Sequence, residues 1–200
     1  MHMSDPASTA LLLCDLQNDF IHPKGAYGRA GLGAAEIAAL PARLAPLSKK
    51  LRGKGGAAVA TMFTLVPGRG GEPLIAPHLK AIRPFLAKGD FAPGAWGQST
   101  VDELLPLDGA VEKIAYSAFW NTRLEWLLRQ LGIETLLISG IVTNGGVAST
   151  LRDAHVRGFH VTLLEDGCAA YKRQVHDETV ASLRHLVPVA TCAQALEALA

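Results

Sequence analysis

Short apolar runs alternate with amphipathic segments along almost the whole chain. The runs are typical of buried strands and cover residues 9–14, 57–63, 110–114, 134–139, 160–164 and, more briefly, 188–191. Apolar residues recur at helical spacing over 39–53, 122–131, 146–157 and 174–186, and a terminal helix is expected after the last strand. This alternation predicts an α/β fold: a single doubly wound, Rossmann-like domain with a parallel sheet of about six strands, flanked by helices on both faces.

Residues 64–100 break this rhythm. They are rich in Gly and Pro, and only a short helix is expected near 77–87. An irregular segment of this length usually has a function of its own, so we expect a lid or an oligomer contact here. No internal repeat or interdomain linker is evident. We therefore predict one domain over residues 1–200, with residues 1–8 disordered.

Composition narrows the function classes. The 200 residues are 49% hydrophobic and carry a formal net charge of +1, with Lys and Arg scattered rather than clustered. Nucleic-acid binding is therefore not expected. The apolar runs are too short for a bilayer and the N-terminus lacks a signal-peptide pattern, so we expect a cytoplasmic protein without a membrane partner.

The cysteines and histidines do not indicate a disulfide or metal site. Cys14, Cys168 and Cys192 are odd in number and show no CxxC spacing, so we expect them to be structural. The seven histidines show no ligand spacing, and no GxGxxG or phosphate-loop motif is present. We predict no metal and no cofactor.

A strand that turns abruptly into a helix lies within residues 136–158, LLISGIVTNGGVASTLRDAHVRG. α/β enzymes often carry a nucleophile on such a turn, but this turn has Gly145 and Gly146 and neither Ser nor Cys. Backbone N–H groups around Thr143 to Gly146 could form a nest for an anion or an oxyanion. The other interpretation is a tight turn that only needs a positive φ.

Two charged residues stand at predicted strand ends, where doubly wound domains bind their ligands. Asp15 directly follows LLLC, and a carboxylate there is costly unless it is paired, functional or hydrogen-bonded to its own turn. Asp19, four residues on, is expected to be a loop or capping residue. Lys113 lies between Val111 and Ile114, although a lone Lys is often a solvated surface charge. The aromatic residues that follow Lys113 could line a pocket or could simply belong to the core.

Four segments carry a resemblance to a known family: DLQNDF at 15–20, Lys113 followed by YSAFWNT, GIVTNGGVASTLRDA at 140–154, and EDGCAA at 165–170. In this order and at these separations, they resemble the isochorismatase-like superfamily, often called the cysteine hydrolases. The resemblance covers nearly the whole chain. The loop after Lys113 and the RDA ending look closest to the branch that hydrolyses ureides.

The resemblance implies roles for these residues. In most of the family the position of Gly146 holds the nucleophilic Cys, Asp15 matches the base that deprotonates it, and Lys113 matches the residue that lowers the thiol pKa and steadies the carboxylate. A cis peptide bond is implied before Thr143. The implied oxyanion nest comprises Val142, Thr143, Gly145 and Gly146, and the implied substrate pocket comprises Phe20, Tyr116, Phe119 and Trp120. Nicotinamidases of the family hold a metal after the second strand, where this chain reads TMFTLVPGRGGEP without a His.

Glycine at position 146 closes the covalent thiol route. True isochorismatases resemble the chain here, because they also carry Gly and cleave a vinyl ether with the matching Asp as general acid. They differ in having a His-containing sequence where this chain reads TNGG. One hypothesis is thus a hydrolase of a small metabolite, without the Cys, in which Asp15 and Lys113 catalyse C–O or C–N cleavage. The alternative is an inactive relative that binds a small ligand or partner. A homodimer or homotetramer is expected in either case.

Overall fold

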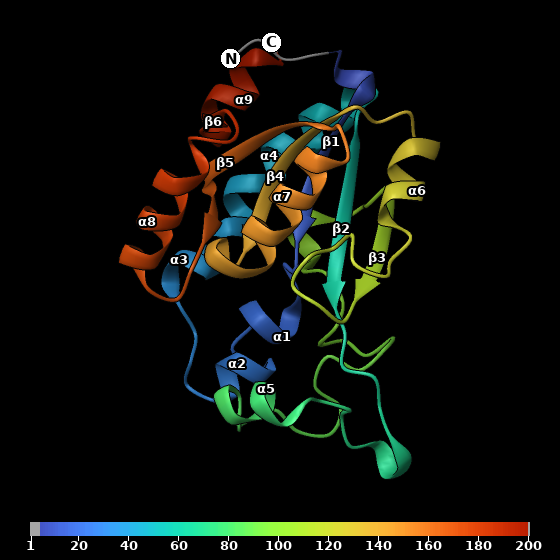
Figure 1. Ribbon diagram of the computed structural model, residues 1–200, viewed down its shortest axis with the longest axis vertical. Coiled ribbons are helices and arrows are strands. Elements are labelled where there is room, and N and C mark those ends of the chain that lie inside the picture. The colour runs from blue at the N-terminus through green and yellow to red at the C-terminus, as the bar shows by residue number, and fades with distance from the viewer. Residues whose placement is uncertain (1–4, 200) are drawn as a thin grey trace.

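The computed structural model describes residues 5–199, and in them one all-parallel sheet has the strand order β3-β2-β1-β4-β5-β6 (Figure 1). The strands are β1 (Thr9–Cys14), β2 (Ala57–Phe63), β3 (Gly109–Lys113), β4 (Thr135–Ile141), β5 (His160–Ala169) and β6 (Val189–Ala190). The chain moves outward from β1 to β3 and then returns to the other side of β1. This reversal places the switch point, the usual ligand-binding position, between β1 and β4. The predicted fold class is confirmed.

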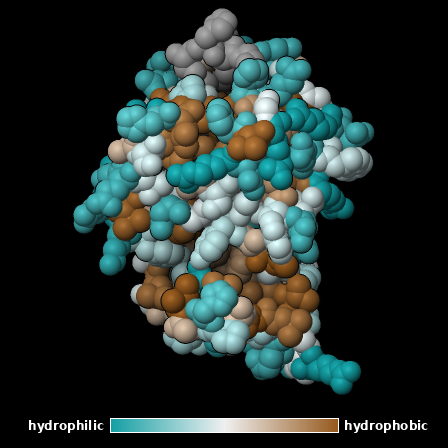
Figure 2. All heavy atoms as spheres, in the orientation of Figure 1, coloured by the Kyte–Doolittle hydropathy of each residue, from teal (hydrophilic) through white to brown (hydrophobic). Residues whose placement is uncertain are grey.

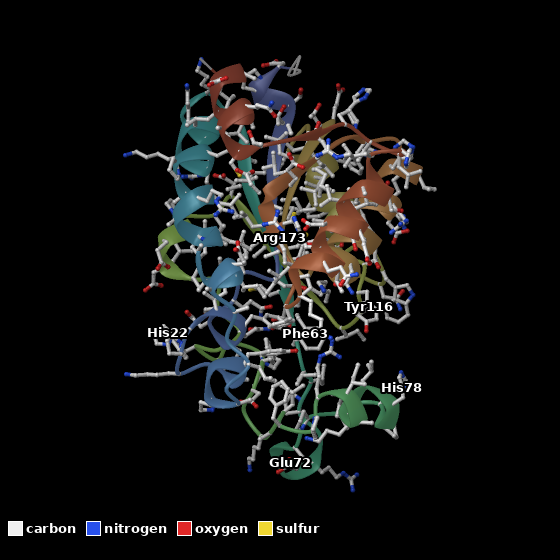
Figure 3. The ribbon with its side chains drawn as sticks, turned by 90° about the vertical axis from the view of Figure 1, so that its left-hand side faces the viewer. His22, Phe63, Glu72, His78, Tyr116 and Arg173 are labelled. Carbon is white, nitrogen blue, oxygen red and sulfur yellow. The ribbon has the colours of Figure 1, made fainter. Side chains whose placement is uncertain are left out.

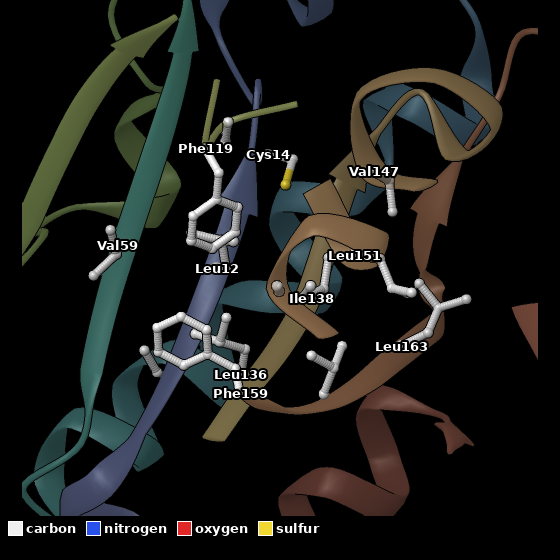
Figure 4. Packing of buried hydrophobic residues seen from close by; sticks show 14 of the residues in the cluster. Leu12, Cys14, Val59, Phe119, Leu136, Ile138, Val147, Leu151, Phe159 and Leu163 are labelled. Atoms are coloured by element: carbon white, nitrogen blue, oxygen red, sulfur yellow. The ribbon is translucent and has the colours of Figure 1, made fainter. Parts of the chain in front are cut away.

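Helices cover both faces of the sheet (Figure 1). One face packs against α3 (Ala35–Ala38), α4 (Leu40–Gly53) and α9 (Cys192–Ala198), and the other against α6 (Leu124–Gln130), α7 (Ala148–Val156) and α8 (Arg173–Leu183). Alternate residues of β1 pack against the helices on the two faces of the sheet, because successive side chains of a strand point to opposite faces. Leu11 and Leu13 pack beside α4, whereas Leu12 lies in the cluster of Figure 4 with Val147 and Leu151.

The predicted helix 39–53 forms because its leucines share one side. Leu40, Leu44, Leu47 and Leu51 recur at spacings of three and four residues, and none is more than 1% exposed. Such a stripe is the signature of a helix with one buried face. Burying each Leu side chain stabilises the fold by about 1.5–3 kcal/mol. The periodicity alone was therefore enough to predict α4.

Two strands, β4 and β5, run beyond their predicted ends at residues 139 and 164. The sequence pattern predicts that this strand ends before Gly140, but β4 continues through Gly140, whose φ is 110°. A Cβ at this position would collide with the carbonyl oxygen of Cys14, so only glycine lets β4 continue beside β1. The register of β5 shifts between Ile138 and Gly140 of β4, and Cys168 and Ala169 then pair with Gly140 and Ile141.

Several helical boundaries also differ. The predicted helix 146–157 begins as a π-helical turn, η4 (Thr143–Val147), before α7. The predicted helix 77–87 is only α5 (Pro77–Ile82), and the short α1 (Asn18–Ile21) and α2 (Ala26–Arg29) were not predicted. Short 3-10 turns form η2 (Arg69–Gly71) and η3 (Asp102–Leu104). The disorder expected over 1–8 is wrong for residues 6–8, which form η1 (Pro6–Ser8); residues 1–4 lie outside the described residues.

Residues 64–100 form a lobe with α1 and α2 beyond the carboxyl edge of the sheet (Figure 1). The lobe has its own small core, and Figure 2 shows apolar residues over much of its surface. Two residues after β1 anchor it. Asp19 lies in α1 rather than in a loop, and it accepts hydrogen bonds from the N–H groups of Ala26, the first residue of α2, and Phe91 at 2.9 and 2.7 Å. The Gln17 amide donates to the carbonyl oxygens of Phe63 and Gln98 at 2.9 and 2.8 Å.

Candidate active site

Asp15 and Lys113 form a buried ion pair at the carboxyl edge of the sheet. The Lys113 Nζ lies 2.7 Å from Asp15 Oδ2, and the two side chains are 2% and 6% exposed. β2 lies between the strands that carry them, and its Thr61 donates a hydrogen bond to Asp15 Oδ1 at 2.9 Å. Lys113 Nζ also donates to the carbonyl oxygen of Ala115 at 3.0 Å. Lys113 is thus not a solvated surface charge, and Asp15 bonds across the strands rather than to its own turn.

The backbone of Asp15 directs its carboxylate into this position. Its φ of 57° lies in the left-handed region, which Asp tolerates better than most residues. The Asp15 N–H still donates to the Thr61 carbonyl oxygen at 3.0 Å, and the Asp15 carbonyl accepts from Gln17 N–H at 2.9 Å. The chain therefore turns sharply at the end of β1 and leaves the carboxylate at the sheet edge.

Burial controls the protonation of Asp15. Removal from water raises the pKa of the Asp15 carboxyl group above its ordinary value, while the Lys113 ammonium and the Thr61 hydroxyl oppose this rise. Asp15 therefore holds a proton more readily than a solvated Asp. Buried carboxyl groups whose pKa is shifted, next to a specific charged partner, are candidates for groups that transfer protons.

The expected cis peptide bond lies just before η4, between Ile141 and Val142, one residue earlier than the resemblance implied. The Val142 carbonyl oxygen accepts hydrogen bonds from Gly145 N–H at 2.9 Å and Val147 N–H at 3.3 Å. Those N–H groups are directed at the turn itself. Gly145 N–H therefore already has an acceptor inside the turn, and the expected nest stays a prediction for Val142, Thr143 and Gly146.

Gly146 lies directly against the ion pair. A Cβ at this position would be 3.1 Å from the Ile141 carbonyl oxygen, 3.2 Å from Asp15 Oδ2 and 3.6 Å from Lys113 Nζ. Any side chain at position 146 would therefore touch Asp15. Glycine leaves the carboxylate open toward the space in front of the turn.

That space is a cavity of about 620 Å³, named here the Asp15 cavity, which separates the sheet edge from the lobe. Phe63 lies where sheet and lobe meet, and Tyr116 and His78 flank the cavity from opposite sides (Figure 3). Apolar and aromatic side chains make up most of its wall. They are Phe20, Tyr27, Phe63, Ile75, Leu79, Ile114, Tyr116, Trp120, Val142, Tyr171 and Val175.

Three of the four predicted pocket residues, Phe20, Tyr116 and Trp120, line the Asp15 cavity, but Phe119 does not. Phe119 is 6% exposed and packs in the core, with its ring centroid 5.9 Å from that of Phe159 (Figure 4). Thr150 Oγ1 of α7 accepts a hydrogen bond from the neighbouring Ala118 N–H at 3.0 Å and holds this loop inward. Placing Phe119 in the pocket was therefore wrong.

Sequence reasoning missed other wall residues. Phe63 is the last residue of β2, so the rule that ligands bind beyond strand ends could have found it. Tyr27 and Arg83 reach the cavity from the lobe, where no periodic pattern indicates the direction of a side chain. Tyr171 comes from the segment between β5 and α8, and its ring stacks on Tyr27 with centroids 5.3 Å apart.

A second cavity of about 640 Å³, named here the His176 cavity, lies on the other side of η4. His176 Nδ1 lies 2.8 Å from Thr143 Oγ1, and both side chains are buried. Burial and the nearby Arg173 lower the pKa of His176, against the pull of Asp177, Glu165 and Glu36. The wall is polar and includes Glu36, Arg43, Glu165, Asp166, Arg173, Asp177 and Arg184.

The cysteines are structural, as expected. Cys14, Cys168 and Cys192 are all free and buried. Burial raises the pKa of the Cys14 thiol to about 12 and raises that of Cys168 as well. None is a thiolate near neutral pH, so none replaces the absent thiol of position 146.

The fold and this site define a doubly wound α/β protein with a buried carboxylate–lysine pair at its switch point. The model of the isochorismatase domain matches residues 9–195, and the chain therefore belongs to the isochorismatase family. Within residues 5–199, no helix combines the length and the apolarity needed to cross a membrane. Nor does this part of the chain group three His, Cys, Asp or Glu side chains as metal ligands.

Sequence relatives are named amidohydrolases. The chain is 34% identical over 172 residues to the ureidoacrylate amidohydrolase RutB of Pantoea ananatis, covering 80% of this chain and 69% of the relative. It is also 34% identical over 179 residues to the protein of the same name from Methylobacterium radiotolerans, covering 81% and 67%.

Solved structures share the fold. A cysteine hydrolase from Pseudomonas syringae has a TM-score of 0.82 at 22% identity, with 100% of this chain and 95% of that chain covered. An N-carbamoylsarcosine amidase from Thermoplasma acidophilum has a TM-score of 0.70 at 24% identity, with 92% and 96% covered.

Proposed function

We propose that the protein is a hydrolase of a small metabolite that uses Asp15 and Lys113 for general acid–base chemistry and has no cysteine nucleophile. One observation carries the proposal: a buried carboxyl group with a raised pKa opens, past Gly146, into a largely apolar cavity of about 620 Å³. A cavity of this size suits a small organic molecule. General acid catalysis by such a group contributes about 10²–10⁴-fold to a rate.

The proposed reaction is hydrolysis of a vinyl ether. Protonated Asp15 gives its proton to the terminal alkene carbon, the electron pair of the double bond forms the new C–H bond, and an oxocarbenium ion results. Lys113 stabilises the carboxylate that Asp15 becomes. Water then adds to the cationic carbon and returns a proton to Asp15. The hemiketal breaks its C–O bond to give a ketone and an alcohol, so one water is consumed.

Hydrolysis of a C–N bond would use the same residues differently. Ionised Asp15 would take a proton from water as the water attacks a carbonyl carbon, and the developing oxyanion would need N–H donors. The N–H groups of Gly145 and Val147 instead point to the Val142 carbonyl oxygen. Those two N–H groups are not available to an oxyanion, so the C–N route would depend on the N–H groups of the other expected nest residues, Val142, Thr143 and Gly146. The named relatives are amidohydrolases.

The test is a panel of enol ethers, ureides, amides and esters incubated with the protein in D₂O. We expect hydrolysis of an enol ether, with one solvent deuterium on the new carbon–hydrogen bond. Asp15→Ala should abolish turnover while circular dichroism shows that the fold survives. Asp177→Asn, an exposed carboxylate outside the Asp15 cavity, is the matched control and should leave turnover unchanged.

A turnover rate that is unchanged by Asp15→Ala would contradict the proposal. So would the absence of any turnover across the panel together with tight binding of one of its members. The second result would instead support an inactive relative that keeps the cavity to bind a small ligand.

A further inference from the structure

The loop that follows β3 is fixed to helix α7 at two points. The Ala118 N–H donates a hydrogen bond to Thr150 Oγ1 at 3.0 Å. The Ser117 hydroxyl donates another to Asp153 Oδ2. Thr150 and Asp153 lie three positions apart and therefore share one face of α7. Because α7 continues directly from η4, this loop and the turn that carries Gly146 are attached to the same helix.

The Asp153 carboxylate is also oriented from its other side. Its Oδ1 lies 3.5 Å from Arg157 Nη1, and Arg157 Nε lies 3.0 Å from Oε2 of Glu125 in α6. The Arg157 guanidinium lies over the Phe119 ring, 5.0 Å from its centroid. One oxygen of Asp153 thus faces Arg157, and the other accepts from Ser117. A hydrogen bond to an ionised acceptor is stronger than one between neutral groups.

The same loop holds Lys113 in place. Besides its ion pair with Asp15, Lys113 Nζ donates to the carbonyl oxygen of Ala115, two residues before Ser117. A buried ammonium group depends on such acceptors, because a buried donor without a partner is costly. Tyr116, between Ala115 and Ser117, belongs to the wall of the Asp15 cavity. Movement of the loop at Ser117 would therefore displace both an acceptor of Lys113 and part of this wall.

We propose that Ser117 and Asp153 are positioning residues for the buried ion pair. They fix the Ala115 carbonyl oxygen, and this oxygen keeps the Lys113 ammonium directed at Asp15. Neither Ser117 nor Asp153 lines the Asp15 cavity, so both act through Lys113 rather than on the substrate. The effect on turnover rests on the proposed function, in which Lys113 stabilises the carboxylate form of Asp15. The effect on the place of Lys113 Nζ does not depend on which bond is cleaved.

A purely structural role for the bond between Ser117 and Asp153 makes a different prediction. A bond that only stabilised the loop would change the free energy of unfolding and leave the surroundings of Lys113 Nζ as they are. A positioning bond must also change how firmly the Lys113 ammonium is held. The ammonium group itself is therefore the right probe, and it can be observed without any substrate.

The test follows the ammonium protons of Lys113 by NMR in protein that contains ¹⁵N-labelled lysine, with the signal assigned by its absence in Lys113→Arg. Exchange of these protons with water is slow while the group is buried and hydrogen-bonded. We expect Ser117→Ala to speed this exchange about tenfold or more, which corresponds to the loss of one charge-assisted hydrogen bond. Ser117→Thr keeps a hydroxyl group and should stay close to the native rate.

Variants of Asp153 give an independent comparison. Asp153→Asn keeps an oxygen that can accept from Ser117, whereas Asp153→Ala removes it, so only Asp153→Ala should speed the exchange. In the enol-ether assay, kcat of the two alanine variants should fall about tenfold or more, and more than KM rises, because Lys113 acts in the proton-transfer step. Glu125→Gln breaks the neighbouring ion pair with Arg157 but leaves the Ser117 bond in place. It is the matched control and should change neither quantity.

Native exchange in folded Ser117→Ala and Asp153→Ala would overturn the proposal. So would exchange in Glu125→Gln as fast as in Ser117→Ala, because any loosening of α6 and α7 would then suffice. If circular dichroism shows that Ser117→Ala does not fold, the two Asp153 variants decide.

The two proposals can fail separately. Fast ammonium exchange in the alanine variants, with no turnover of any panel compound by the native protein, would keep the positioning role and reject the proposed function. Turnover that requires Asp15, with native ammonium exchange in both alanine variants, would do the reverse.

Discussion

The two cavities beside η4 have nearly the same volume, about 620 and 640 Å³, but their charges are arranged differently. In the His176 cavity, Arg173 pairs with Asp177 and Arg184 pairs with Glu165. In the Asp15 cavity the ion pair is buried, and Arg83 faces an apolar space without an acidic partner. Volume therefore does not distinguish a reaction site from a surface hollow. The burial of the charged groups does differ, because the Asp15–Lys113 pair is buried whereas the ion pairs of the His176 cavity are exposed or half-exposed.

The turn η4 lines the Asp15 cavity and contacts a wall residue of the His176 cavity. Gly146 faces the Asp15 cavity, whereas the neighbouring Thr143 side chain contacts His176 on the other side. One side of η4 leaves a carboxylate accessible, and the other fixes the turn by a buried hydrogen bond. Substitutions on the Asp15 side should accordingly change turnover, and those on the His176 side should change stability but not turnover.

Removing one member of the ion pair should have the largest effect. Lys113→Met leaves Asp15 buried without its cation, so we expect loss of turnover and a fall of about 3–5 kcal/mol in the free energy of unfolding. Urea denaturation and the enol-ether assay measure the two effects. The double variant Asp15→Leu with Lys113→Met removes both charges and should recover most of the stability but none of the turnover. A double variant as unstable as the single one would contradict this account of the pair.

Gly146→Cys tests whether the Asp15 cavity can support a cysteine nucleophile. Its effect on stability should be smaller than that of Lys113→Met. Because a Cβ would lie 3.1 Å from the Ile141 carbonyl oxygen, the turn must move slightly, at a cost of about 1–3 kcal/mol. The new thiol would lie beside Asp15 and Lys113, and we expect measurable hydrolysis of a ureide or amide. Gly145→Cys, one position away in the same turn, is the control and should gain no such activity. Ureide hydrolysis equal in both variants would argue against position 146 as a nucleophile site.

The sequence predicted the sheet side of the site better than the lobe side. Asp15 and Lys113 follow apolar strands, and parallel strands bring their carboxyl ends to one edge, so strand order alone nearly places them. Arg83 and Tyr27 come from irregular chain, where Gln17 and Asp19 hydrogen bonds determine the path of the backbone. Those contacts join residues up to 81 positions apart, as in the Gln17–Gln98 bond, and no local pattern encodes them.

Phe119 and Gly140 show two further limits. Phe119 belongs to an aromatic-rich loop, and whether an aromatic ring faces core or cavity depends on how α7 holds that loop. Gly140 suggested a strand end because glycine often marks a turn, yet here it lets β4 pass close to Cys14. In both cases the deciding contact comes from a distant part of the chain.

His176→Gln should have a moderate, pH-dependent effect. It disturbs a buried hydrogen bond to Thr143, so we expect a loss of about 1 kcal/mol in the free energy of unfolding at pH 7.5. Because the native pKa of His176 is lowered, the unfolded chain binds the proton first, and native stability is full above about pH 6.5 and falls as the pH drops below it. Arg173 favours the neutral ring, while Asp177, Glu165 and Glu36 favour the charged one.

Thermal melts at pH 7.5, 6.5 and 5.5 measure this slope. The native protein should lose melting temperature across this range, and His176→Gln should lose less. His185→Gln, which changes an exposed histidine after α8, is the control and should retain the native slope. Equal slopes in the native protein and His176→Gln would show that His176 does not titrate in this way.

Of these variants, Arg173→Gln should have the smallest effect on the free energy of unfolding. Its ion pair with Asp177 is exposed, at 71% and 53% for the two side chains, so its loss should change the free energy of unfolding by at most about 0.5 kcal/mol. Arg173 also lowers the pKa of His176, so its removal should reduce the loss of stability that occurs as the pH falls. With less repulsion the His176 pKa rises toward its ordinary value, so the acid-dependent loss becomes shallower. Turnover should stay unchanged, since Arg173 lines the His176 cavity and not the Asp15 cavity. A fall in turnover in Arg173→Gln without a fall in stability would mean that the two cavities are not separate in function.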